Sequence, residues 1–203
     1  MTDTLRGGTG LLDDVGAALR NARPDGPDER FEQTAWLALL ASTGDGLLRR
    51  TQAPAHLTAS AAVLSEDGSQ TCLVFHHKMR KWVQPGGHFE PDDTGGAQAA
   101  AREVVEETGL TGRVLGSPVL LSRHRAPCAP GVVDWHLDLQ YLMVTPVVEP
   151  TPSDESPQVR WWPVGELPDN LASGVPELVR RAGQVLATTP TALTTSGTPG
   201  TPR

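Results

Sequence analysis

The sequence predicts an α/β fold. Three runs have the residue types and alternation of β-strands: residues 57–64, 71–76 and 132–148. Two segments with apolar residues at helical spacing lie between and after these runs, one ending at Gly109 and one at residues 175–186. Because strands and helices are interspersed along the chain, we expect helices to cover the faces of the sheet.

The first strands are expected to form a hairpin, because Asp67-Gly68 lies between residues 57–64 and 71–76. After Gly109 another strand is expected, and Pro118 within it favours an edge position or a bulge. The longest run, residues 132–148, alternates apolar and polar residues in its first half. His136 and Asp138 share its polar face, where they either reach a metal or substrate or form a satisfied hydrogen-bond pair.

The chain divides into three parts by pattern and composition. Residues 1–50 are expected to form a helical extension packed on the main domain, residues 51–187. From residue 188 onward Thr, Pro, Gly and Ser dominate, and such a segment cannot bury enough apolar surface to offset its chain entropy. Residues 188–203 are therefore predicted to be a disordered tail.

Composition narrows the functional classes. The net charge of −7 argues against binding of a nucleic-acid polymer through its backbone. Cys72 and Cys128 suggest neither a disulfide framework nor a zinc pattern, and reduced thiols are expected. No apolar run approaches the ~20 residues of a membrane span, and the N-terminal residues lack the pattern of a secretory signal. We therefore expect a cytoplasmic protein with no membrane partner.

The stretch from Trp82 to Leu110 carries the strongest chemical signal. It opens with a Pro-Gly-Gly turn at residues 85–87, which lets the backbone approach a ligand closely. In the following helix three carboxylates lie within about a quarter-turn of one another. They belong to Glu103, Glu106 and Glu107. Carboxylates at that spacing repel each other in a partly dry site, and a hard divalent cation with oxygen ligands relieves the repulsion.

The segments GGHFEPDD and REVVEETGL together resemble the signature of the Nudix hydrolases. The match is complete from Arg102 to Leu110. Upstream, the sequence departs from the family pattern because Asp93 replaces a Glu, and eight residues rather than seven separate it from Arg102. The extra residue leaves the helical carboxylate spacing intact. Asp93 then either joins the site or, like Asp92 and Thr94, caps the helix. The resemblance implies an α/β/α sandwich with a mixed central sheet.

The resemblance also implies a reaction: metal-dependent hydrolysis of a diphosphate linkage in a nucleotide or related organic diphosphate, by water attack at phosphorus. Mg²⁺, or alternatively Mn²⁺, is the implied cofactor. The implied metal ligands are the Gly86 carbonyl, Glu103, Glu106 and Glu107. Arg102 is expected to orient the carboxylates and keep them ionised. The general base is either Glu103 or an acidic loop residue, for which Glu155 is the candidate.

Other assignments stay open. His88, Arg123 and Arg125 are candidates for binding the substrate phosphates, although a turn and a solvated basic loop explain them equally well. A binding or regulatory module without turnover is one alternative function. An enzyme of isoprenoid diphosphates is another, although neither cysteine lies in the Asn-Cys context of the related isomerase. The expected partner is a small diphosphate, and the extension leaves a homodimer open.

Overall fold

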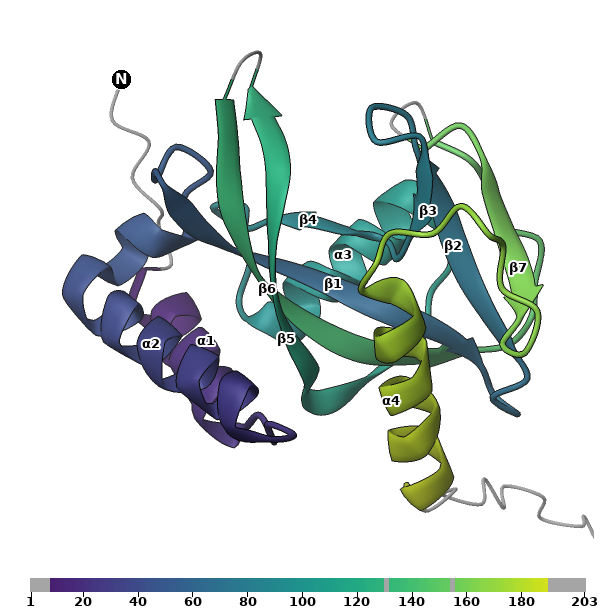
Figure 1. Ribbon diagram of the computed structural model, residues 1–203, viewed down its shortest axis with the longest axis horizontal. Helices are drawn as coiled ribbons and strands as arrows, with labels where there is room; N and C mark the ends of the chain where they lie inside the picture. Colours follow the sequence, from purple (N-terminus) through teal and green to yellow (C-terminus); the bar gives the residue numbers. More distant parts are fainter. Residues whose placement is uncertain (1–7, 130–131, 154–155, 190–203) are drawn as a thin grey trace, which may run out of the picture.

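A computed structural model describes residues 8–129, 132–153 and 156–189 (Figure 1). The helices and strands run in the following order: α1 Gly8–Asn21, α2 Pro27–Thr43, the 3₁₀ helix η1 Gly44–Leu48, β1 Ala55–Ser65, β2 Gln70–His76, β3 Lys81–Val83, β4 Gly86–His88, α3 Gly96–Thr108, β5 Arg113–Ala129, β6 Val132–Thr145, β7 Val159–Pro163 and α4 Val175–Thr188. The predicted mixed α/β fold is confirmed.

The sheet is mixed because β1 pairs with strands of both directions. Its main path runs β3-β2-β1-β6-β5, while β4 pairs with β1 and β7 pairs with β2. The β1–β6 pair is parallel along the whole of β1, from Ala55 opposite Trp135 to Ser65 opposite Thr145. All other strand pairs are antiparallel. Strand β1 therefore brings the short strand β4 and the long strand β6 together.

The two faces of the sheet are covered by different helices, as Figure 1 shows with α3 behind the sheet and α4 in front. Alternate residues of β1 pack with α1, α2 and α3 in one apolar cluster; these are Leu57, Ala59, Ala61 and Val63. On the other face Ala62 and Leu64 pack with α4. Nearer the start of β1, this second face carries His56, Thr58 and Ser60 instead, since side chains two apart share a face.

The local features largely match the sequence. The β1–β2 turn has Gly68 at a φ of 71°, and the register of β5 shifts between Leu115 and Leu120, around the expected irregularity at Pro118. Within the expected helical extension, α2 has Pro27 as its first residue and Gly44 as its C-cap. Of the expected tail, Thr188 still belongs to α4, and the residues after Thr189 lie outside the described ranges. Within the described ranges no helix combines the length and apolarity needed to span a membrane.

Candidate active site

The glycines of β4 are required by close contacts. A Cβ atom on Gly86 would lie 2.2 Å from the Cβ of Ser60, and one on Gly87 would lie 2.4 Å from Oε1 of Glu103. Real atoms do not approach that closely, so any side chain here would displace β1 or the carboxylate. The Gly-Gly turn therefore lets α3 lay its acidic face directly against the backbone of β4.

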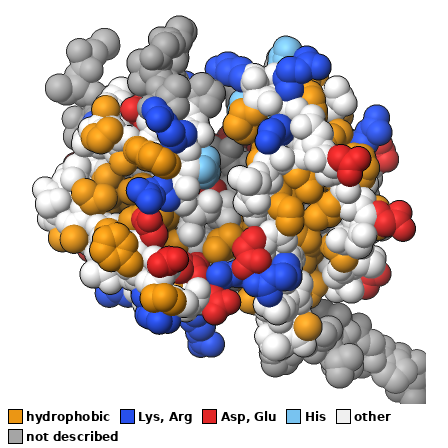
Figure 2. All heavy atoms as spheres, viewed as in Figure 1, with side chains coloured by type: hydrophobic (Ala, Val, Ile, Leu, Met, Phe, Trp, Pro, Cys, Tyr) orange, Lys and Arg blue, Asp and Glu red, His pale blue; other side chains and the backbone are white. Residues whose placement is uncertain are grey.

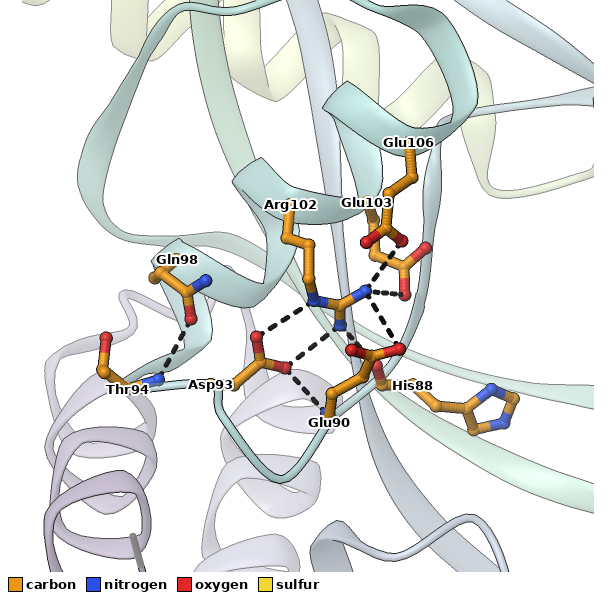
Figure 3. A network of polar contacts seen from close by, with 8 residues as sticks. All are labelled: His88, Glu90, Asp93, Thr94, Gln98, Arg102, Glu103 and Glu106. Atoms are coloured by element: carbon orange, nitrogen blue, oxygen red, sulfur yellow. Dashed lines mark hydrogen bonds and ion pairs between the residues drawn. The ribbon is translucent and has the colours of Figure 1, made fainter. Parts of the chain in front are cut away.

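Arg102 of α3 holds the acidic residues together (Figure 3). Its Nη1 atom lies 3.1 Å from Glu103 and 2.9 Å from Glu106. Its Nη2 atom donates to the carbonyl of His88 at 2.8 Å. One guanidinium thus fixes two carboxylates of the helix relative to the end of β4, which is the orienting arrangement expected for Arg102.

Asp93 lies inside this network despite the extra residue in the loop. Its two oxygens accept from Nε and Nη2 of Arg102, each at 3.0 Å, and Oδ2 also accepts from the backbone N–H of Glu90 at 2.8 Å. The residue is only 3% exposed. A bidentate pair of this kind is geometrically specific. Asp93 is therefore a buried anchor for Arg102.

The helix is capped by a different residue from those expected. Gly95 occupies the N-cap position of α3 without a side-chain cap. The backbone N–H of Gly96 instead donates to Oδ1 of Asp14, on α1, at 2.9 Å. The capping prediction for Asp92, Asp93 and Thr94 is wrong, because α3 begins after Gly95 and the carboxylate that accepts from its first turn comes from the extension.

The glutamates differ in exposure and charge state. Burial raises the pKa of the Glu103 carboxyl from its ordinary 4.5 to about 7; the charges of Glu107 and Glu106 act in the same direction, while Arg102 opposes them. Its side chain is 13% exposed, against 51% for Glu106. Glu107 accepts from the N–H of Gly86 at 2.9 Å and from the hydroxyl of Ser156 at 2.7 Å.

This donor set fits a divalent cation. Three carboxylates (Asp93, Glu103 and Glu106) contact one guanidinium, and the charge of Glu107 also acts on Glu103, so negative charge is in excess. A hard cation with oxygen ligands offsets such an excess. The structure brings Glu103 and Glu107 to the Gly86 strand, while Glu106 reaches Arg102.

The remaining predicted site residues are Glu155, Arg123 and Arg125. Glu155 lies outside the described residues, although its neighbour Ser156 contacts Glu107. Arg123 pairs with Glu32 of α2 at 3.0 Å and lies 4.9 Å from the ring centroid of Trp135. Arg125 lies 5.6 Å from the same ring. In the structure both arginines stack on Trp135, and their contribution to phosphate binding stays a prediction.

The structure also brings together four histidines, of which only His88 was a predicted site residue. His56, His88 and His136 have ring centroids 4.8–5.1 Å apart, and His124 lies 5.4 Å from His136. Figure 2 shows that few histidine side chains reach the surface in that view, one of them in a recess between two parts of the molecule. Burial is the main cause that lowers the pKa of His88 to about 4 and of His136 to about 3, so both are neutral at pH 7. We call these four residues the histidine cluster.

Asp138, on the same face, is a satisfied hydrogen-bonding residue. It is 2% exposed and accepts from Thr58 at 3.0 Å, from Ser60 at 2.7 Å and from Gln140 at 2.9 Å. These bonds compensate the burial of its charge. Of the two interpretations of the polar face of β6, hydrogen bonding thus holds for Asp138, whereas His136 joins the histidine cluster.

The N-terminal helices contact both layers of the domain. Besides the Asp14 cap, Glu29 of α2 accepts from the N–H of Leu121 at 3.2 Å and pairs with Arg181 of α4 at 2.7 Å. Leu19 and Trp36 are buried in the same apolar cluster as α3. The extension therefore supports the helix that carries the acidic residues.

Comparison with known proteins agrees with this geometry. Among protein-family models, the NUDIX domain matches residues 54–182, more than half of the chain. The chain belongs to the Nudix family. This confirms the expected family and supports the expected class, a pyrophosphohydrolase. A comparison with curated proteins finds no match.

Solved Nudix structures share the fold. A NUDIX family hydrolase from Clostridium perfringens has a TM-score of 0.50 at 20% identity, over 65% of this chain and 96% of that chain. The NUDIX domain of Shewanella oneidensis NrtR, crystallised with ADP ribose, has a TM-score of 0.52 at 20% identity, over 64% and 87%. An Ap4A hydrolase from C. elegans has 0.50 at 19% identity, over 64% and 97%. At these identities the likeness concerns the fold.

Proposed function

We propose that this Nudix protein is a metal-dependent hydrolase that cleaves the diphosphate linkage of a nucleotide or related organic diphosphate. The observation that carries the proposal is the excess of carboxylates around Arg102, packed against a glycine strand that leaves no room for side chains. A pure binding module has no evident use for such a site, because an excess of carboxylates repels a polyanionic ligand in the absence of a metal.

Glu103, Glu106, Glu107 and the carbonyl of Gly86 are the groups that would hold Mg²⁺ or Mn²⁺. Such an ion offsets the charge of the diphosphate and makes a bound water more acidic. Other side chains of the protein hold these ligands in position. Arg102 fixes the directions of Glu103 and Glu106, and the buried Asp93 fixes Arg102.

Glu103 is the better-supported general base of the two predicted candidates. A base works best when its pKa lies near the working pH, and burial brings the pKa of Glu103 to about 7. The competing candidate, Glu155, lies outside the described residues. A proton taken from water by Glu103 would stay beside Arg102, 3.1 Å away, whose charge helps to restore the carboxylate after turnover.

The substrate class is supported by chemistry and by the names of similar structures. One similar domain was crystallised with ADP ribose and another is an Ap4A hydrolase, and both compounds contain phosphoanhydride links. An isomerase of isoprenoid diphosphates is less well supported. Cys72 is buried, and burial raises the pKa of its thiol to about 12, so it is a poor acid or nucleophile.

The test is a panel of nucleoside diphosphate derivatives incubated with Mg²⁺ or Mn²⁺, with products separated by ion-exchange chromatography. Cleavage to monophosphates is expected, with a loss of at least 100-fold in Glu106→Gln, and no turnover with EDTA. Glu90→Gln is the matched control, because Glu90 is an exposed acid 3.8 Å from the same guanidinium but outside the helix. Binding without cleavage across the panel would favour the regulatory alternative.

Three further expectations stay predictions. The domain division at residue 50 is supported by the family match, which begins at residue 54. A cytoplasmic location and a homodimer rest on the sequence arguments alone. Size-exclusion chromatography with light scattering tests the dimer directly.

A further inference from the structure

Three strands place one histidine each at the same point of the sheet. In β1, His56 lies opposite His136 of β6. His88 of β4 lies opposite Thr58, two residues from His56 and on the same face. One ligand nitrogen from each ring lies within 4.8 Å of the other two. This set is separate from the carboxylates, because no glutamate of α3 belongs to it.

A hydrogen bond to a backbone carbonyl orients the ring of His56, as is common for metal-ligating histidines. Its Nδ1 atom lies 3.1 Å from the carbonyl oxygen of Gln52. A carbonyl only accepts, so Nδ1 carries the hydrogen and the lone pair of this ring is on Nε2. Metal-ligating histidines commonly donate the other ring N–H to such a carbonyl. The Nε2 atom of His88 lies 3.2 Å from Nε2 of His56 and donates its hydrogen to that lone pair.

We propose that His56, His88 and His136 form a second metal site, one that binds a borderline transition-metal ion such as Zn²⁺ or Co²⁺. Around a tetrahedral ion with bonds of about 2.0–2.1 Å, neighbouring nitrogens lie roughly 3.4 Å apart. The 3.2 Å contact between His56 and His88 already has that spacing, and the third nitrogen needs only a small side-chain movement. The ion replaces the hydrogen shared by the two rings, and that hydrogen moves to the other nitrogen of His88.

Ligand chemistry separates this site from the carboxylate site. Three neutral imidazoles suit Zn²⁺, Co²⁺ or Cu²⁺, whereas Mg²⁺ requires oxygen ligands. Because three neutral imidazoles leave the charge of the ion at +2, the site would take an anionic oxygen, such as a phosphate oxygen, at its fourth position.

The site is linked to the acidic network through one residue. The ring of His88 belongs to the histidine set, while its carbonyl accepts from Arg102 at 2.8 Å. An ion on the histidines would fix the end of β4 from the face opposite α3. It would also place a net charge of +2 beside these rings, where it can hold one phosphate of a substrate.

The test is Co²⁺ binding to the full chain, measured by equilibrium dialysis and by the visible absorption of tetrahedral Co²⁺. The absorption of one tetrahedral ion is expected in the wild type and in a triple variant with Glu103, Glu106 and Glu107 changed to Gln, in which dialysis should count that ion alone. Binding should weaken at least tenfold in His136→Ala. The matched control is His124→Ala, which removes a neighbouring histidine outside the metal set and should keep the ion.

Inorganic phosphate should change the Co²⁺ spectrum, because it enters the fourth position. X-ray absorption of the Zn²⁺-loaded wild type should show three imidazole ligands, which tests the site even if a histidine variant fails to fold. The proposal is overturned if tetrahedral Co²⁺ is absent, if His136→Ala and His124→Ala bind equally, or if the ion is lost only in the glutamate variant. The last outcome leaves the hydrolase proposal intact.

Discussion

Replacing Glu103 with Gln should stabilise the metal-free protein above pH 7 and remove its stabilisation by Mg²⁺. The folded-state pKa of Glu103 is about 7, above its ordinary 4.5. Between these values the folded state holds more protons than the unfolded state, so stability falls as pH rises through this window. One pKa unit corresponds to about 1.4 kcal/mol, which sets an upper bound of about 3 kcal/mol for the cost of ionising this buried side chain.

Glu103→Gln keeps an acceptor for Arg102 and removes the charge. We expect urea unfolding with EDTA to show a gain of about 1–3 kcal/mol at pH 8 that disappears near pH 4.5. With Mg²⁺ at 100 times its dissociation constant, the wild type should gain about 2.7 kcal/mol and the variant much less. Glu106→Gln is the control, since its side chain is 51% exposed and its removal should change metal-free stability little.

The reasoning fails if the difference between wild type and Glu103→Gln is the same at pH 5 and pH 8. It also fails if Glu106→Gln produces the larger metal-free effect, because the effect is assigned to burial. A gain that persists in Mg²⁺ would show that Glu103 does not hold the ion.

Further predictions concern the groups around α3. Asp14→Ala should lower stability by about 1–2 kcal/mol in urea unfolding by uncapping α3, whereas Asp13→Ala, with an exposed side chain on the same helix, should not; equal effects would contradict the cap. Asp93→Asn should cost about 2–4 kcal/mol and lower Mg²⁺ affinity in calorimetry, with the exposed Asp92→Asn as control; unchanged stability would refute its anchoring role. Gly87→Ala places a Cβ atom 2.4 Å from a carboxylate oxygen and should weaken Mg²⁺ binding at least tenfold; an unchanged titration would show that the contact relaxes freely.

The fold was predictable where local pattern is strong. The hairpin at Gly68, the end of α3 at Gly109 and the closing helix all follow from turn and capping residues or from helical spacing. The grouping of the α3 carboxylates was equally predictable, because helical spacing alone puts Glu103 and Glu106 on one side of the helix. Local spacing does not show what lies opposite that side.

What sequence could not reveal depends on contacts distant in the chain. The histidine set needs residues 56, 88 and 136 from three strands, and only the sheet register aligns them. The sequence feature that pointed to this set was the polar face of β6, which carries His136. Asp14 gave no signal, since it looks like any exposed acid of an amphipathic helix. Arg123 was a candidate for phosphate binding or for a solvated loop, and its pairing with Glu32 depends on the docking of α2.

The contact between Asp14 and Gly96 has a consequence for the order of folding. The two residues are 82 positions apart. The first turn of α3 is therefore completed only after the N-terminal helix has docked, so this turn belongs to the same cooperative unit as α1. Exchange of the Gly96 amide hydrogen with solvent should report the undocking of that helix, and the frequency of undocking limits how rigidly the acidic residues are held.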